Sequence, residues 1–152
     1  MAIDTSGTWW VGSDKSDVSD YLNALTDGKI DQFRAARCNC SSDTFEVDFD
    51  GDAGCVRRKC GGCHATSFVC DSAEQWPSAS PERYECVACG SKTANVVIGF
   101  TLRPATLKNR IGFARDVKWV FVGVRCDRCG VLGCVADWKI NYLPSAILVT
   151  QV

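Results

Sequence analysis

The cysteines of this chain constrain its fold more than any other feature. Eleven of the 152 residues are cysteine, and most of them stand in pairs separated by one or two residues. An odd number of cysteines cannot all form internal disulfides, and closely spaced pairs are typical of metal ligands in a reducing compartment. We therefore expect a cytoplasmic protein whose fold is built around metal ions held by cysteine.

An internal repeat groups these pairs. Residues 38–49 (CNCSSDTFEVDF) align with residues 86–100 (CVACGSKTANVVIGF) when the second cysteines of the two segments are superposed, and residues 56–63 align with residues 122–129. Each copy has a cysteine pair, a strand, a turn, a returning strand, a second cysteine pair and a third strand. This order resembles a zinc ribbon, in which a β-hairpin brings two cysteine pairs to one Zn²⁺, about 2.3 Å from each sulfur.

The repeat predicts two structural zinc sites of four cysteines each. The first comprises Cys38, Cys40, Cys60 and Cys63, and the second comprises Cys86, Cys89, Cys126 and Cys129. A zinc-binding cysteine pair, or knuckle, usually has two residues between its cysteines, whereas only Asn39 separates Cys38 from Cys40. His64 or Cys70 could therefore replace Cys38 as a ligand.

Three cysteines lie outside the repeated pairs. Cys55, Cys70 and Cys134 each align with a phenylalanine or an alanine in the other copy, and neither residue can bind a metal. We expect these three thiols to be buried as small hydrophobic side chains.

The residue patterns predict a mainly β fold of the small α+β class. Tandem zinc-ribbon-like modules, each a β-hairpin extended to three strands, are expected to pack together with one N-terminal helix. The helix is predicted over residues 17–26, where apolar residues recur at helical spacing. We expect residues 1–37 to pack on the core, residues 38–85 to form the first module with its linker, and residues 86–152 to form the second module. The three parts are expected to make one compact unit.

The strands of the second module require cover on both faces. Residues 95–102 and 117–124 are apolar at both alternating positions, a pattern of strands buried on both sides. We expect the cover to come from a short strand at residues 7–12, from the first module and from the apolar tail 146–149. Residues 135–142 alternate polar and apolar, which predicts an edge strand that packs Trp138 and Tyr142 into the core.

The tip of the second hairpin is a candidate partner-binding segment. Residues 101–118 are rich in basic side chains, and the side chains at a hairpin tip do not have to pack into a core. The candidate contact residues are Arg103, Lys108, Arg110, Phe113 and Arg115. Such a tip suits an acidic protein surface or a phosphate backbone. The first hairpin, by contrast, is expected to present an acidic face of Glu46, Asp48 and Asp50 that would repel a polyanion.

Composition and motifs disfavour several classes of function. The formal net charge is −1, and ionising eight thiols around two Zn²⁺ ions makes it more negative, which disfavours nucleic acid. No apolar run reaches the roughly 18 residues of a membrane span. Four thiolates close the shell of each metal, and no HExxH or similar motif supplies a general base, so we expect no enzymatic activity.

Several of these segments together resemble a known set of proteins. GTWWVG near the start, the cysteine pairs, a KWV strand leading into GVRCDRCG, and ADWKINY near the end resemble small bacterial cytosolic proteins with two zinc-ribbon-like modules of four cysteines each. The resemblance covers most of the chain. It implies bound zinc and a bacterial source, and it implies no particular activity. The tip at residues 103–116 is longer than the short turn expected in those proteins.

The sequence thus favours a non-catalytic protein-interaction module with two structural zinc ions and an unidentified protein partner. Two alternatives remain open at this stage. One is a nucleic-acid-binding ribbon that uses the basic tip, and the other is a thiol redox sensor that uses the cysteines outside the metal sites.

Overall fold

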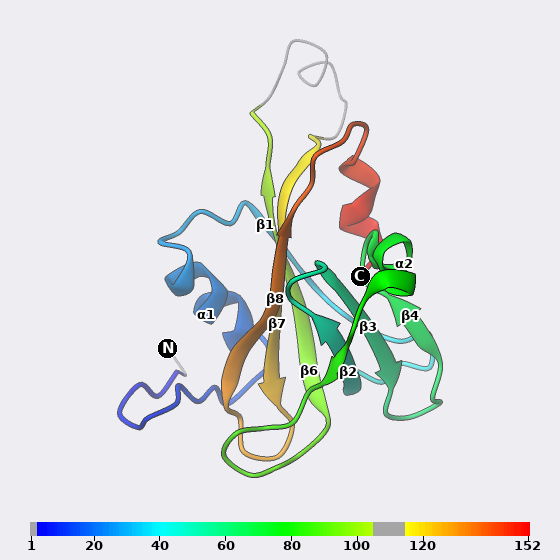
Figure 1. The fold of residues 1–152 in the computed structure, drawn as a ribbon. Coiled ribbons are helices and arrows are strands. Elements are labelled where there is room, and N and C mark those ends of the chain that lie inside the picture. Colours follow the sequence, from blue (N-terminus) through cyan, green and yellow to red (C-terminus); the bar gives the residue numbers. More distant parts are fainter. Residues whose placement is uncertain (1–2, 105–114) are drawn as a thin grey trace.

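Strands are the main element of the fold, and the helices are few and short. The computed structural model describes residues 3–104 and 115–152 (Figure 1). The helices are α1 (Asp17–Leu25) and α2 (Ser72–Gln75), and the 3₁₀ turns are η1 (Trp76–Ser78) and η3 (Ala146–Thr150). The strands are β1 (Gln32–Ala35), β2 (Phe45–Asp50), β3 (Cys55–Cys60), β4 (Thr66–Phe68), β5 (Glu82–Arg83), β6 (Ala94–Leu102), β7 (Val117–Cys126) and β8 (Leu132–Lys139). The predicted mainly β fold with one N-terminal helix is confirmed.

All eight strands belong to one antiparallel sheet. Its order is β4-β3-β2-β6-β7-β8, with β1 added to β6 and β5 added to β2. The three strands of each repeat are neighbours in this order, and the two sets meet where β2 pairs with β6. That junction consists of a single residue pair, Phe45 with Ala94.

The two repeats are related by a pseudo-twofold axis at this junction. Phe45 pairs with Cys60 inside the first repeat, and Ala94 pairs with Cys126 inside the second. The repeat in the sequence superposes Phe45 on Ala94, so these two residues are counterparts, and they also pair with each other across the junction. An antiparallel pair of counterpart residues lies on a local twofold axis. The internal repeat is therefore also a symmetry of the fold.

The same symmetry governs the short strand that precedes each cysteine pair. Strand β1 leads into the first repeat but pairs with β6 of the second, with Ala35 opposite Val97. Strand β5 leads into the second repeat but pairs with β2 of the first, with Arg83 opposite Asp48. The two registers are equivalent under the repeat. The strand that precedes each repeat therefore pairs with the other repeat, so the two repeats exchange these strands.

The inner faces of the two repeats share one hydrophobic core. Phe45 and Val47 of β2 are fully buried in the same cluster as Ile98 and Phe100 of β6 and Val122 of β7. Residues from both sides of the β2–β6 junction therefore pack into one cluster. A single residue pair joins β2 directly to β6, and the exchanged strands β1 and β5 add further pairs between the two halves.

Helix α1 covers the other face of β6 and β7. Its Val18 and Leu22 are fully buried in a second cluster with Ile30 and Val97. Close packing requires Gly123 on β7, because a Cβ atom there would lie 2.6 Å from Val18 Cγ1 and 2.8 Å from Leu22 Cδ1. Strands β6 and β7 are therefore covered on both faces, as their apolar patterns predict.

Two sequence-based expectations are wrong in detail. Residues 7–12 form no strand: Val11 makes only isolated bridges, and Trp9 and Trp10 are 48% and 38% exposed. The tail at residues 146–149 does cover the core, since it forms η3 and buries Leu148 and Val149. Tyr142 is 41% exposed, because its hydroxyl donates to Asp71 at the surface instead of entering the core.

Candidate metal centres

Each hairpin carries its cysteine pairs to one end of the sheet. In the second repeat, one pair precedes β6 and the other follows β7, and these two strands are paired along their length. The Sγ atoms of Cys86 and Cys129 are 3.4 Å apart, and those of Cys89 and Cys126 are 3.5 Å apart. All four sulfur atoms lie within 4.8 Å of one another.

The first repeat builds the same arrangement. The Sγ atoms of Cys38 and Cys63 are 3.4 Å apart, those of Cys40 and Cys60 are 3.5 Å apart, and all four lie within 4.8 Å of one another. The distances match those of the second site pair by pair. The shorter spacing of Cys38 and Cys40 therefore does not prevent the fourth thiol from reaching the site.

These distances fit a single tetrahedral ion. A metal bound at about 2.3 Å to four thiolates holds neighbouring sulfurs about 3.8 Å apart. A disulfide requires about 2.05 Å, and all eleven cysteines are free thiols. A multi-iron cluster places several metal atoms between the sulfurs and so needs wider spacing than 4.8 Å. Both groups could hold one metal ion each.

The thiols of each site differ in their tendency to ionise. The backbone N–H of Cys63 points to Cys60 Sγ (3.4 Å) and, with the N–H of Gly62 (3.3 Å), lowers the pKa of Cys60 to about 6. Burial opposes ionisation of Cys126, but N–H groups of its own knuckle lower its pKa to about 6 as well. The N–H of Ala65 favours the thiolate of Cys63, yet neighbouring sulfurs raise its pKa to about 11. Four thiolates this close need a bound cation.

The backbone of the knuckles follows the repeat as closely as the sulfurs do. Ser41 and its counterpart Gly90 both have positive φ, at 75° and 76°. His64 and its counterpart Gly130 also both have positive φ, at 66° and 81°. A non-glycine residue is strained at positive φ. The first repeat therefore keeps the same turns as the second, although it has Ser41 and His64 where glycine would fit without strain.

A buried arginine lies beside the first site. Arg58 is only 7% exposed, and its guanidinium stacks on the ring of Phe45 at 4.6 Å and donates to the carbonyl of Val152 at 2.7 Å. Burial lowers the pKa of Arg58, while the sulfurs of Cys38 and Cys60 raise it. Four thiolates around a divalent ion carry a net charge of −2, which this buried cation partly offsets.

Sequence reasoning missed Arg58, although a signal was present. The repeat places Arg58 on Val124, so a charged residue occupies a position that is apolar in the other copy. Its β3 neighbours Val56 and Cys60, at alternate positions, are fully buried. A charge on the buried face of a strand indicates a specific partner.

The cysteines and histidine outside the two groups take other positions. His64 is exposed and is not among the residues gathered at either site within the described part of the chain. Cys70 is buried and its thiol donates to the carbonyl of Leu148, away from the first site. Cys55 is fully buried, and Cys134 is partly buried against α1. Cys38 rather than His64 or Cys70 therefore stands at the fourth corner of the first group.

The basic tip is only partly described. The guanidinium of Arg103 donates to the carbonyl of Ile140 at 2.6 Å, and that of Arg115 donates to the carbonyl of Arg103 at 2.8 Å. These two side chains tie the base of the tip to the neighbouring strand end. The other three candidate contact residues lie outside the described residues: Lys108, Arg110 and Phe113.

The acidic face of the first hairpin is largely neutralised. Asp48 forms ion pairs with Arg57 at 3.0 Å and with Arg83 at 3.1 Å. Glu46 lies 3.8 Å from both Lys59 and Arg83. A basic residue of β3 or β5 lies opposite each of these two carboxylates in the sheet. Their negative charge is therefore largely balanced, and this face would repel a polyanion much less than expected.

No family model, curated protein or solved structure matches the chain. The two cysteine groups agree with the expected two cysteine modules, and the expected relation to bacterial two-zinc proteins stays a prediction. Within residues 3–104 and 115–152, no helix is both long and apolar enough to cross a membrane.

Proposed function

We propose that this protein is a zinc-binding module of the cytoplasm, in which two Zn²⁺ ions are structural, and that it acts by binding another protein. The observation that carries the proposal is the gathering of four sulfur atoms within 4.8 Å in each repeat. Four thiolates are a ligand set of structural zinc and leave no open position for water or substrate. A non-catalytic role follows from this closed shell.

The zinc ions supply cohesion where the chain has little apolar surface to bury. At the metal end of each hairpin, Cys40, Cys63 and Cys89 are exposed, so the knuckles are held by few hydrophobic contacts. A structural zinc ion contributes its binding free energy directly to folding. Folding of the cysteine pairs in both repeats is therefore coupled to metal.

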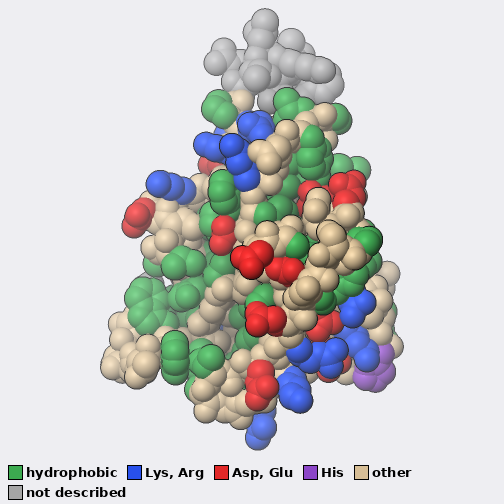
Figure 2. Space-filling view, viewed as in Figure 1, with side chains coloured by type: hydrophobic (Ala, Val, Ile, Leu, Met, Phe, Trp, Pro, Cys, Tyr) green, Lys and Arg blue, Asp and Glu red, His purple; other side chains and the backbone are tan. Residues whose placement is uncertain are grey.

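Protein binding is supported by apolar side chains that remain at the surface. Trp9 is 48%, Leu25 55% and Val87 67% exposed, and all three line hollows on the second repeat. Exposed apolar groups gathered at hollows are typical of interaction sites. Figure 2 shows apolar side chains over α1 and the N-terminal segment at the lower left of the molecule.

Metal content and metal-dependent structure test this proposal. Protein purified without added metal should contain close to two zinc ions per chain. A strong chelator should abolish the near-UV circular dichroism of its tryptophans, and zinc should restore it. Protein that keeps its near-UV spectrum after losing all metal would contradict a structural role for zinc.

The nucleic-acid alternative is less well supported. Two of the five proposed contact residues already donate hydrogen bonds within the chain. The guanidinium groups of Arg103 and Arg115 both donate to backbone carbonyls. Binding through phosphate contacts would weaken steeply with salt. Absence of binding at low salt would remove this alternative.

The redox alternative is also less well supported. Burial raises the pKa of Cys70 far above that of a free thiol and that of Cys134 to about 11. Burial also raises the pKa of Cys55. A sensor thiol needs a low pKa and access to solvent. Alkylation of zinc-loaded protein should therefore be slow at all three positions.

A further inference from the structure

The C-terminal segment of the chain fills a groove on the first repeat. The carbonyl of Gln151 accepts a hydrogen bond from the backbone N–H of Cys70, just after β4, at 2.6 Å, and the carbonyl of Val152 accepts one from the guanidinium of Arg58 on β3 at 2.7 Å. Leu148 and Val149 are buried in the shared core. The segment 145–152 thus runs from the start of β7, where Ser145 bonds Val117, past β1 to the end of β4, and it closes the core on this side.

The pseudo-twofold axis places an equivalent groove on the second repeat, and this one is open. The counterpart of Arg58 is Val124, and the counterpart of Val69, which precedes Cys70, is Val135. Val124 and Val135 line a hollow of about 370 Å³ together with Phe49, Tyr84 and Val87. We call this hollow the open groove. Its lining comes from β8, the last strand of the sheet order, and from the segment that leads into β6.

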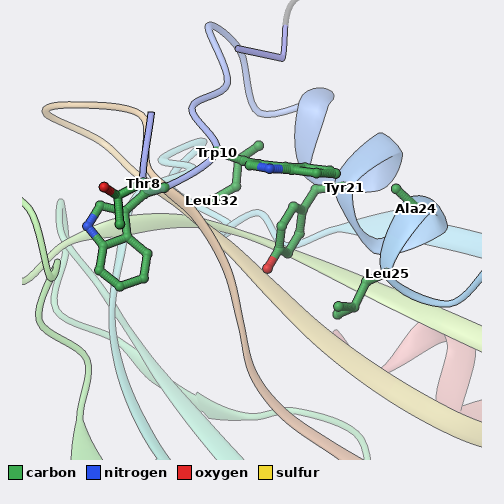
Figure 3. Close-up of a pocket in the computed structure, with 7 residues that line it drawn as sticks. Thr8, Trp10, Tyr21, Ala24, Leu25 and Leu132 are labelled. Atoms are coloured by element: carbon green, nitrogen blue, oxygen red, sulfur yellow. The ribbon is translucent and has the colours of Figure 1, made fainter. Parts of the chain in front are cut away.

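The open groove has an aromatic end. Trp9, Tyr21 and Leu132 line both the open groove and a neighbouring cleft of about 400 Å³ between the N-terminal segment and α1. In this cleft the ring of Trp10 stands edge-on to Tyr21 with centroids 5.8 Å apart, and Leu25 projects from α1 below them (Figure 3). Apolar surface therefore continues beyond the groove.

The opposite end of the open groove is acidic. Phe49 and Val135 also line an adjoining hollow of about 590 Å³, which is bordered by Asp50, Asp52 and Glu82. None of these three carboxylates has an ion-pair partner within the described residues. On the filled side the counterpart of Glu82 is Arg34, so an acidic residue of the open groove corresponds to a basic residue of the filled one.

From this symmetry we infer that the open groove binds a short apolar segment of a partner protein that carries basic residues at one end. The inference rests on the proposed protein-binding function and names its site. On the filled side, η3 lies near Arg34, and Val152 lies at Arg58. A segment bound in the same direction places its N-terminal end at Glu82 and its apolar C-terminal end at Val124. Basic residues therefore precede the apolar ones, where the acidic end attracts them.

Synthetic peptides provide the ligands for the test. The parent peptide is SAILVTQV, the sequence of residues 145–152, extended at its N-terminus by two lysines. A second peptide has two glutamates instead, and a third keeps the lysines but has serine in place of the leucine and both valines. Binding to the zinc-loaded full chain is measured by calorimetry. We expect the lysine peptide to bind at least tenfold more tightly than the glutamate peptide, and the serine peptide not to bind.

Protein variants locate the bound peptide. Val87→Glu changes a side chain that is 67% exposed and lines the open groove, and Trp9→Ala gives a second groove variant. Leu143→Glu is the matched control, since this leucine is 63% exposed and does not line the groove. Val87→Glu and Trp9→Ala should each weaken binding at least tenfold, and Leu143→Glu should not change it.

Each other outcome overturns the inference. Binding that survives both groove variants would mean that the peptide displaces the C-terminal segment instead. Equal binding of the lysine and glutamate peptides, or no binding at millimolar concentration, would also overturn it. Zinc content measured on the same samples separates the two proposals: two ions without peptide binding refutes only the groove, whereas absent zinc refutes the metal sites.

Discussion

Two buried cysteines offer a matched test of which thiols hold metal. Cys126 and Cys55 both have fully buried side chains, but only Cys126 belongs to a group of four. Serine is nearly isosteric with cysteine. The two substitutions Cys126→Ser and Cys55→Ser therefore impose a similar packing change and differ in the loss of a ligand.

The expected magnitudes differ clearly. Burying a hydroxyl in place of a thiol at Cys55 should cost about 1–2 kcal/mol, the usual penalty for an imperfectly satisfied polar group. Structural zinc binding is worth about 10–16 kcal/mol, so one of four ligands accounts for about 2.5–4 kcal/mol if they share it equally. Cys126→Ser should therefore lose about 3.5–6 kcal/mol of folding free energy in total, enough to unfold the second repeat of a marginally stable protein.

The assay combines zinc analysis with urea unfolding in a zinc-buffered solution. Cys55→Ser should retain two zinc ions per chain and unfold at a slightly lower urea concentration. Cys126→Ser should retain at most one ion and unfold much earlier. If Cys126→Ser keeps two ions and matches Cys55→Ser in stability, the assignment of the second site is wrong.

Three further predictions concern the frame around the sites. Gly123→Ala should destabilise the protein by about 1–2 kcal/mol in urea unfolding, because α1 must shift to admit the added Cβ. Gly133→Ala is the control and should be neutral, since its added Cβ would lie 3.7 Å from its nearest neighbour. Equal effects of the two substitutions would contradict the packing of α1. His64→Gly should retain two zinc ions and raise stability by up to about 1 kcal/mol, since it relieves a positive φ; loss of one ion would identify His64 as a ligand. Arg58→Leu should cost about 1–3 kcal/mol and speed proteolysis at the C-terminus; unchanged proteolysis would mean that Arg58 does not anchor Val152.

The sequence was most informative where chemistry repeats. Cysteine spacing and self-alignment were enough to group Cys86 with Cys129, because thiolate chemistry and hairpin geometry leave few alternatives. They left Cys38 open against His64 and Cys70, and only the folded structure places Cys38 beside Cys63. The helix at α1 was equally readable from its apolar spacing. Both features depend on local pattern.

Features that depend on tertiary context were not readable. Strands β1 and β5 have four and two residues and carry no periodic signal, so their exchange between the repeats could not be foreseen. The apolar run of residues 146–149 has no pattern that separates a strand from a 3₁₀ turn. The exposure of Trp9 and Trp10 depends on how the N-terminal segment lies against α1 and Leu132 in the folded chain.

X-ray absorption at the zinc edge of the purified, zinc-loaded protein tests the central claim most directly. With two ions per chain established by elemental analysis, the spectrum reports the average ligand set of both sites. Two closed sites of four cysteines each predict four sulfur atoms at about 2.3 Å and no nitrogen or oxygen in the coordination shell. A mixed shell with nitrogen or oxygen, or a stoichiometry of one ion, would contradict two structural zinc sites made of eight cysteines.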